Sequence, residues 1–325
     1  MTKKSVILLI LSFNFILNIS FSQVPYSYET IDKKIDILSK TSKLIESEKI
    51  GVSVQGKDIK VLKVGSGDTH YLITAGMHAR ENINPSISLW IADYLVKERR
   101  ELLKEVTIHI VPLLNPDGYK LAMDPKTHFI FGDNWEGSDL KANFNGVDLN
   151  KNFPTVYWDH KEDKLMDTKK QIRYFLSDQA KPALKSFEGD VLQPETKALM
   201  DYMWRYDFKT YIDMHSRGEV IYWDTWQKPL EYRKYKSRLI TYISKKLGYK
   251  KMDWVSYNQA KGYGYATDYF TLVKGGDAFT LETANINISL PNNDFENFEK
   301  AFNETKDLIY HLHNYYKDND LLKKD

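Results

Sequence analysis

Apolar residues along this chain fall into two alternating patterns. Short runs that are continuously apolar, or that alternate with polar residues, predict strands, and longer stretches with apolar residues three or four positions apart predict helices. The strands are expected at residues 57–64, 71–75, 107–114, 209–214, 220–223 and 278–283. The helices are expected at residues 26–44, 85–103, 194–204, 230–247 and 294–315. The second helix has Asn84 as a candidate N-cap and Pro85 at its first position.

The alternation of strands and helices predicts the fold class. Such an order is typical of α/β proteins in which helices cover both faces of one sheet. Neither a Pro/Ser-rich linker nor an internal repeat interrupts the pattern, although residues 115–185 are poor in apolar periodicity and are expected to form loops. We therefore predict one domain, residues 23–325, with a mixed, mostly parallel central sheet and helices on both faces.

The N-terminal segment has the pattern of a secretory signal peptide. Lys3 and Lys4 precede an apolar run over residues 6–17, and the Ser-Phe-Ser sequence at 20–22 resembles a cleavage site. The alternative is an uncleaved membrane anchor, but the apolar run is short for a bilayer span. We expect residues 1–22 to be removed and the mature protein to be secreted or periplasmic.

The composition restricts the partners of the mature chain. Without Lys3 and Lys4, the 46 basic residues become 44 and equal the 44 acidic residues, so the charge balance gives no argument for a nucleic-acid partner, and we expect none. The chain has no cysteine, so neither a disulfide nor a lipid anchor on cysteine can form. We expect a monomer without stable membrane association after signal cleavage.

The first candidate site lies in the sequence LITAGMHARE, residues 72–81, where an apolar strand ends. It presents His78 and Glu81 three positions apart, and His215 follows another apolar strand far downstream. Two imidazoles and a carboxylate can hold a catalytic zinc ion while a further position stays open for water. Each residue alone is more often a solvated or structural side chain, so the prediction of a metal site rests on the combination.

Two further segments concentrate polar side chains. The loop VDLNKNF contains Asp148, Asn150 and Lys151, although Asn and Asp are also common in simple turns. Glu282 lies inside the last predicted strand, where a carboxylate is costly to bury unless it is paired, faces a cleft or has a function. Both segments add weight to the predicted metal site.

Six short motifs follow one another in a recognisable order. They are GMHARE (76–81), NPDGY (115–119), NGVDLNKNFP (145–154), QPET (193–196), DMHS (213–216) and TLET (280–283). In this order they resemble the motifs of the M14 (carboxypeptidase A-like) family of zinc carboxypeptidases, and the resemblance extends from about residue 26 to the last helix. Any one motif could occur by chance, but the ordered set is specific. The chain resembles a bacterial, secreted member of that family.

The resemblance implies a role for each matching residue. His78, Glu81 and His215 would bind one zinc ion. Glu282 would be the general base that takes a proton from the attacking water and later gives it to the leaving amine. Asp148 would accept a hydrogen bond from His78 and fix the orientation of its ring.

Two lysines stand where the family carries arginines. Lys151, beside the substrate-binding Asn150, replaces the arginine that clamps the terminal carboxylate of the substrate. Lys141 replaces the arginine that stabilises the oxyanion. Lysine offers a point charge, whereas arginine offers a planar guanidinium group that can bind a carboxylate with two hydrogen bonds. We therefore hypothesise that the enzyme requires a free C-terminal carboxylate less strictly than its relatives do.

The residues that would contact the substrate's side chain are harder to assign from the resemblance. A tyrosine that caps the substrate should lie upstream of the catalytic glutamate, and we assign it to Tyr257, with Tyr263 and Tyr265 as alternatives because of an apparent insertion. The specificity pocket falls near Thr267 and Asp268. Asp268 either favours a basic side chain or amine, or caps a helix.

The predicted function is that of a zinc metallocarboxypeptidase, which hydrolyses peptide bonds near the C-terminus of peptides. Some bacterial members of the family cut γ-D-glutamyl-diaminopimelate bonds in peptidoglycan stem peptides, which makes such peptides a candidate substrate. One alternative is an N-acyl amino acid deacylase of the aspartoacylase-like type, but the NPDGY and NGVDLN motifs argue against it. The other is a non-catalytic descendant that binds peptides or glycans, but the complete set of ligands and Glu282 argue against it.

Overall fold

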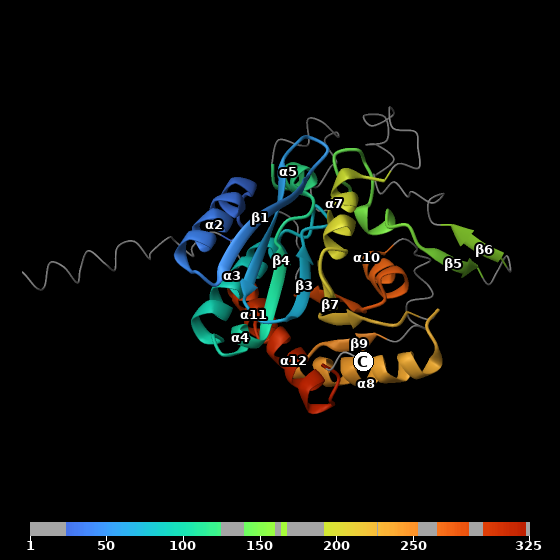
Figure 1. The fold of residues 1–325 in the computed structure, drawn as a ribbon. Helices are drawn as coiled ribbons and strands as arrows, with labels where there is room; N and C mark the ends of the chain where they lie inside the picture. The colour runs from blue at the N-terminus through green and yellow to red at the C-terminus, as the bar shows by residue number, and fades with distance from the viewer. Residues whose placement is uncertain are drawn as a thin grey trace, which may run out of the picture.

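The computed structural model describes residues 24–124, 140–159, 164–167, 192–225, 227–252, 265–285 and 295–322. The strands of the main sheet are β1 (Ile45–Val52), β2 (Asp58–Gly65), β3 (Thr69–Ala75), β4 (Val106–Val111), β7 (Phe208–Ser216), β8 (Val220–Tyr222), β9 (Lys250–Met252) and β10 (Asp277–Thr283). They follow the spatial order β1-β2-β4-β3-β7-β10-β8-β9 (Figure 1). A separate hairpin pairs β5 (Val156–Asp159) with β6 (Lys164–Asp167).

The centre of the sheet is parallel and its edges are mixed. Strands β4, β3, β7 and β10 run parallel to one another. On one side, β2 and β1 continue the sheet antiparallel, and on the other side β8 is antiparallel to β10 while β9 is parallel to β8. The predicted mixed, mostly parallel sheet is confirmed.

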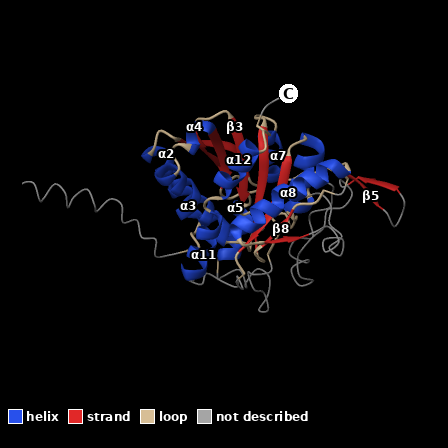
Figure 2. Ribbon diagram, turned by 90° about the horizontal axis from the view of Figure 1, so that it is seen from below, coloured by secondary structure: helices blue, strands red, loops and turns tan. Residues whose placement is uncertain are grey.

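Helices cover both faces of this sheet (Figure 2). They are α2 (Tyr28–Thr41), α3 (Ile83–Glu98), α4 (Leu102–Glu105), α5 (Pro116–Met123), α7 (Pro194–Met203), α8 (Leu230–Leu247), α10 (Ala266–Tyr269), α11 (Phe295–Thr305) and α12 (Leu308–Asp318), with short helical turns η3 (Leu149–Lys151) and η7 (Phe270–Lys274). Helices α2, α3, α8, α11 and α12 bury their apolar residues on one face, and α7 and α10 on the other. No helix in the described ranges is long and apolar enough to cross a bilayer.

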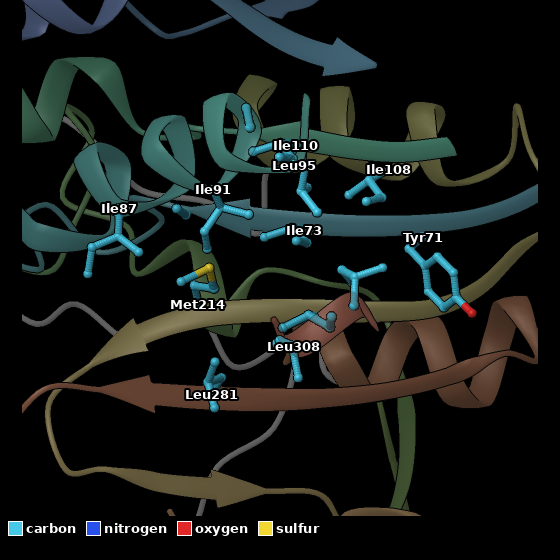
Figure 3. Close-up of a cluster of buried hydrophobic side chains, with 14 of the residues drawn as sticks. Tyr71, Ile73, Ile87, Ile91, Leu95, Ile108, Ile110, Met214, Leu281 and Leu308 are labelled. Atoms are coloured by element: carbon cyan, nitrogen blue, oxygen red, sulfur yellow. The ribbon is translucent and has the colours of Figure 1, made fainter. Parts of the chain in front are cut away.

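Side chains of the central strands alternate between the two faces. In β3, Tyr71 and Ile73 join the hydrophobic cluster under α3, whereas Leu72 joins the cluster under α7. Figure 3 shows Met214 of β7 and Leu281 of β10 beside each other in the first cluster. Since successive residues of a strand point to opposite faces, the residues that follow Met214 and Leu281 point together to the other face.

The closing helix differs from its prediction. The pattern predicts one helix over 294–315, but the described part of this segment forms α11 and α12, which are separated at Lys306 and Asp307. The carboxylate of Asp307 accepts hydrogen bonds from the Tyr94 hydroxyl (2.9 Å) and the Arg99 Nε (2.8 Å). This tertiary contact with α3 holds Asp307 at the break, and helical periodicity carries no signal for it.

The helix predicted over 85–103 also has different ends. It begins at Ile83, ends at Glu98 and is followed by the separate α4. The prediction of Asn84 as its N-cap is wrong, because Asn82 occupies that position. Instead, the side-chain oxygen of Asn84 accepts a hydrogen bond of 2.6 Å from the Thr283 hydroxyl. Asn84 therefore ties α3 to the end of β10.

The apolar pattern misses several elements. Strand β1 (sequence IESEKIGV) lies at the sheet edge and buries only two of its side chains, so its pattern is too polar to indicate a strand. Helix α5 lies in the segment expected to form loops, where Asn115 caps it by accepting a hydrogen bond of 2.9 Å from the Gly118 amide. The pattern also misses the hairpin β5-β6 and the short α10.

Candidate metal centre

Two neighbouring strand ends bring the predicted metal ligands together. His78 and Glu81 lie in the turn after β3, and His215 lies near the end of the neighbouring β7. In the register of β7 with β10, His215 is the partner of Glu282. Because these strands are parallel, their carboxyl ends meet at one edge of the sheet, where α/β folds place their ligands.

The three candidate ligands are buried and close enough to share one ion. One ligand atom from each of His78, Glu81 and His215 lies within 4.8 Å of the others. The two carboxylate oxygens of Glu81 lie 2.7 Å from Nδ1 of His78 and 2.8 Å from Nδ1 of His215. The two Nδ1 atoms are 3.1 Å apart.

A buried carboxylate fixes the far side of each imidazole. Asp148 Oδ1 lies 3.0 Å from Nε2 of His78, and Asp213 Oδ2 lies 2.8 Å from Nε2 of His215. A carboxylate can only accept, so these contacts favour a proton on each Nε2, and each Nδ1 would then offer its lone pair to a cation in place of the proton that its contact with Glu81 otherwise needs. Asp213 is itself held by the Thr74 hydroxyl, which donates to its Oδ1 at 2.7 Å.

The sequence reasoning missed Asp213. It lies two residues before His215 in β7, so the two side chains share one face of the strand. A carboxylate at that spacing from a histidine in a strand is a usable signal for an orienting partner. Asp148, to which the resemblance assigned this role, lies 3.0 Å from Nε2 of His78, a distance similar to the 2.8 Å between Asp213 and His215.

The donor set fits a divalent cation. Two lone pairs and a carboxylate converge on one point, and such groups repel one another unless a proton or a cation lies between them. Burial disfavours charge on His78 and His215, but the negative charges of Glu81 and of Asp148 or Asp213 outweigh it and raise the pKa of both imidazoles. Two imidazoles and one carboxylate are the ligand types of catalytic zinc sites.

Glu282 has the protonation behaviour of a proton shuttle. Burial, followed by the negative charge of Glu81, raises its pKa to about 7, against the opposing charges of the histidines and of Lys141. A carboxyl group with a pKa near the working pH can both accept and donate a proton. Its place beside His215 puts it next to the candidate metal ligands.

The structure also places both lysines of the predicted site near this centre. The Lys141 carbonyl accepts a hydrogen bond of 3.3 Å from the Ala79 amide, and the Lys141 charge acts on Asp148 and Glu282. Lys151 has its Nζ 3.2 Å from the centroid of the Tyr265 ring, in a cation–π contact. Their roles toward a substrate stay predictions.

Asn150 links the loop to its surroundings. It is buried, its side-chain oxygen accepts a hydrogen bond of 3.0 Å from the Ala266 amide, and its Nδ2 lies 3.2 Å from Nε2 of His215. These contacts join the loop around Asn150 to the start of α10 and to the end of β7. Tyr257, the predicted capping residue, lies outside the described residues.

Comparison with known proteins identifies the family. The family model of the zinc carboxypeptidases, peptidase family M14, matches residues 31–312, which is most of the chain. The chain therefore belongs to this family of zinc-dependent metallopeptidases, which are hydrolases. The six motifs all lie within this matched range, so the family predicted from them is confirmed.

Individual relatives are distant. The chain is 27% identical to Gamma-D-glutamyl-L-diamino acid endopeptidase 1 of Lysinibacillus sphaericus over 298 residues, which cover 84% of this chain and 69% of that protein. It is 30% identical to Carboxypeptidase M of Mus musculus over 140 residues, which cover 39% of this chain and 30% of that protein. The chain thus spans less than one third of the length of Carboxypeptidase M.

Solved structures share the fold. Bovine thrombin-activatable fibrinolysis inhibitor, in complex with tick carboxypeptidase inhibitor, superposes with a TM-score of 0.70 at 20% identity and covers 92% of this chain and 100% of its own. Carboxypeptidase A from Helicoverpa armigera gives a TM-score of 0.62 at 20% identity and covers 89% of this chain and 73% of its own. The predicted zinc carboxypeptidase-like fold is confirmed.

Proposed function

We propose that this chain is a zinc metallocarboxypeptidase that hydrolyses peptide bonds near the C-terminus of peptides, with His78, Glu81 and His215 as the ligands of one zinc ion. The observation that supports this most directly is the convergence of these three ligand atoms within 4.8 Å, beside Glu282 on the adjacent strand. The orientation of both imidazoles by buried carboxylates adds to it, because metal-binding histidines commonly have such partners.

The chain's own residues divide the remaining work. When bound, zinc polarises the scissile carbonyl and lowers the pKa of a water molecule. Glu282 accepts a proton from the attacking water and returns it to the leaving amine. Lys141 supplies positive charge for the oxyanion, and Lys151 attracts the terminal carboxylate of the substrate with less directional preference than an arginine would.

For the substrate, we propose peptides with a γ-D-glutamyl bond to a diamino acid, as in peptidoglycan stem peptides. The relative that matches 84% of this chain is named for cleavage at a γ-D-glutamyl-L-diamino acid bond. An exported enzyme would meet such peptides, and we propose export through a signal peptide at residues 1–22, on the basis of Lys3, Lys4 and the apolar run that follows them.

The test is hydrolysis by the mature, zinc-loaded protein beside Glu282→Gln. The substrates are peptides of mixed C-terminal sequence, a stem peptide with a γ-D-glutamyl-diaminopimelate bond and a set of N-acyl amino acids, with products identified by mass spectrometry. We expect zinc-dependent peptide cleavage that falls about 10²–10⁴-fold in the variant. The zinc content should not change, because Glu282 is not a ligand.

Two outcomes would contradict the proposal. Cleavage of the N-acyl amino acids alone would favour the deacylase. The absence of any cleavage by protein that holds one equivalent of zinc would indicate a binding protein, and the two lysines in place of arginines would then be the first cause to examine.

A further inference from the structure

Two of the six motifs contribute no residue to the proposed function. They are NPDGY at 115–119 and QPET at 193–196. QPET begins helix α7, with Gln193 as its N-cap and Pro194 in its first turn. The side chain of an N-cap residue commonly accepts a hydrogen bond from the first turn of its own helix. Gln193 makes no such bond, and its side chain contacts a different segment instead.

The side chains of Gln193 and Glu195 both contact Asn143, a residue of the same loop as Asp148. Nδ2 of Asn143 donates to Oε1 of Gln193 at 2.9 Å and to Oε2 of Glu195 at 3.1 Å. Asn143, Gln193 and Glu195 are buried, with exposed fractions of 2%, 1% and 0%. Separating such groups would leave each of them buried without a hydrogen bond, which is costly. We call these three residues the α7 clamp.

The side-chain oxygen of Asn143 shapes the turn that leads to Asp148. It accepts hydrogen bonds of 3.1 Å from the backbone amides of Asn145 and Val147. The Asn143 amide donates to the Val147 carbonyl at 2.9 Å, and Gly146 has a φ of 78° within this turn. Both hydrogens and the oxygen of the Asn143 side chain are therefore in use, and aspartate could not replace it because it has no N–H group.

Gln193 also holds the loop at two further points. Its Oε1 accepts a hydrogen bond of 2.9 Å from Nδ2 of Asn145, and its backbone amide donates to Oδ1 of Asn152 at 2.8 Å. Asn145 and Asn152 lie on either side of residues 146–151, which include Asp148 and the proposed substrate-binding residues. The start of α7 therefore holds this segment at both of its ends.

The residues before Asn143 have a separate support. The Ala79 amide donates to the Lys141 carbonyl at 3.3 Å, which ties Lys141 to the turn after β3. Nδ2 of Asn115, the first residue of the NPDGY motif, donates to the Ala142 carbonyl at 3.1 Å. The backbone at Lys141 is thus fixed by that turn and by the N-cap of α5, so the two halves of the loop depend on different supports.

We propose that the α7 clamp positions residues 146–151 for both zinc binding and substrate binding. Through this segment it holds Asp148 against His78, with Asp148 Oδ1 3.0 Å from Nε2 of the imidazole. It also holds Asn150 and Lys151 toward the terminal carboxylate of the substrate, and this part of the inference deepens the proposed function and rests on it. The clamp acts through these groups, so its members are positioning residues.

The test exchanges a donor and an acceptor within the clamp. Asn143→Asp places a carboxylate opposite the side-chain oxygens of Gln193 and Glu195, so the loop should lose this support. Glu195→Gln alone either turns an N–H group toward Nδ2 of Asn143 or takes the acceptor away from the Val54 amide, which now donates to Glu195 at 3.1 Å. In the double variant, the amide at position 195 can donate to the carboxylate at position 143 and still accept from Val54. The double variant should therefore recover most of what each single variant loses.

Zinc affinity is the first readout, because it does not depend on catalysis. In competition with a chromophoric chelator, Asn143→Asp should bind zinc about tenfold more weakly, as expected when the partner of a metal-binding histidine is displaced. The second readout is the separation of KM from kcat at saturating zinc. KM for free-acid peptides should rise by up to about tenfold and kcat should change less, because contacts to the terminal carboxylate act equally in the ground state and the transition state.

Ala198→Gly is the matched control for a merely structural defect. Ala198 lies in the same helix but faces Gly51 of β1, so the glycine should weaken α7 at a point away from the clamp. Zinc affinity and KM of this variant should equal those of the wild type. Circular dichroism selects a temperature at which all variants are folded.

The outcomes separate the inference from the proposed function. Unchanged zinc affinity and KM in Asn143→Asp, or equal losses in the single and double variants, would overturn the inference. If the wild type binds zinc but cuts no peptide, the proposed function is wrong, and zinc affinity alone decides the inference. If the wild type binds no zinc, hydrogen exchange of residues 146–151 decides it: exchange should be faster in Asn143→Asp than in the double variant, and wild-type exchange in Asn143→Asp would overturn the clamp.

Discussion

The metal centre and the surroundings of Lys236, a buried residue of α8, both bring opposite charges together, but they hold them in different ways. In the metal centre, Nε2 of each histidine is fixed by a carboxylate, and Thr74 holds Asp213 in turn. Around Lys236, the charges of Asp277, Asp268 and Asp224 act on the ammonium group, which makes no hydrogen bond within the described residues. Directed hydrogen bonds therefore hold the metal centre, whereas charge without a directed contact balances Lys236.

This difference matches what each region has to do. A metal ion requires its ligands at fixed distances and angles, so a network that orients the imidazoles before the ion binds lowers the cost of binding. A buried ammonium group that only balances nearby carboxylates needs the sign of the potential more than a fixed geometry. The same kinds of residue therefore orient ligands in one region and balance charge in the other.

Asp213→Asn should have the largest effect on this comparison. Asparagine keeps an acceptor for the imidazole but removes the charge, so zinc affinity should fall by about 10–100-fold. Competition with a chromophoric chelator measures it, and Asp148→Asn is the matched variant on the other histidine. Lys236→Met should leave zinc affinity unchanged. A loss of zinc affinity in Lys236→Met would show that the two regions are not separable.

The free energy of unfolding should depend on pH with opposite signs in the two regions. In the metal-free protein, the raised pKa values of His78 and His215 give stability that is fully present below pH 6.5 and is lost as the pH rises through their folded values. The slope is about 1.4 kcal/mol per pH unit for each proton released. Zinc would take the place of these protons, so the zinc-loaded protein should keep this stability as the pH rises.

Lys236 acts in the opposite direction. Burial lowers its pKa from 10.5 to about 8, so the unfolded state binds more protons between these values and stability should rise with pH there. Chemical denaturation from pH 6 to 10, with and without a chelator, in wild type and Lys236→Met, resolves both contributions. Equal slopes with and without zinc above pH 6.5 would contradict the histidine assignment.

Lys151→Arg should have the smallest effect. A guanidinium group would add about one charge-assisted hydrogen bond to the terminal carboxylate, so KM for free-acid peptides should fall by about tenfold or less. Amidated peptides serve as the control, because they lack that carboxylate. An equal change for both kinds of peptide would show that Lys151 does not contact the carboxylate.

The sequence predicts the centre of the sheet well because interior parallel strands are apolar on both faces. The expected strands at 71–75 and 278–283 correspond closely to β3 and β10. The candidate site residues His78, Glu81, His215 and Glu282 follow or lie in such strands, and their combination, rather than any one of them, carries the prediction of a metal site. Edge strand β1 gives no such signal, because most of its side chains face away from the core.

The sequence pattern cannot predict features that depend on tertiary contacts. Lys236 lies in a helix rich in lysine and arginine, so its pattern suggests solvent exposure, and only the packing of α8 shows that it is buried. The break at Asp307 depends on Tyr94 and Arg99, which are more than two hundred residues away in the chain. Asp213 could have been found, because its spacing from His215 fixes the face that both share.

The ligand spacing also determines the order of assembly. His78 and His215 are 137 positions apart, and Glu282 comes later still, so no local segment contains the complete set. In small metal-dependent domains the free energy of metal binding supplies the free energy of folding. Here the central strands must pair over long sequence separations before the ligands meet, which is a slow step that the ion cannot template. Zinc supply should therefore control how much of the folded protein is active, while the yield of folded chain depends on the sheet.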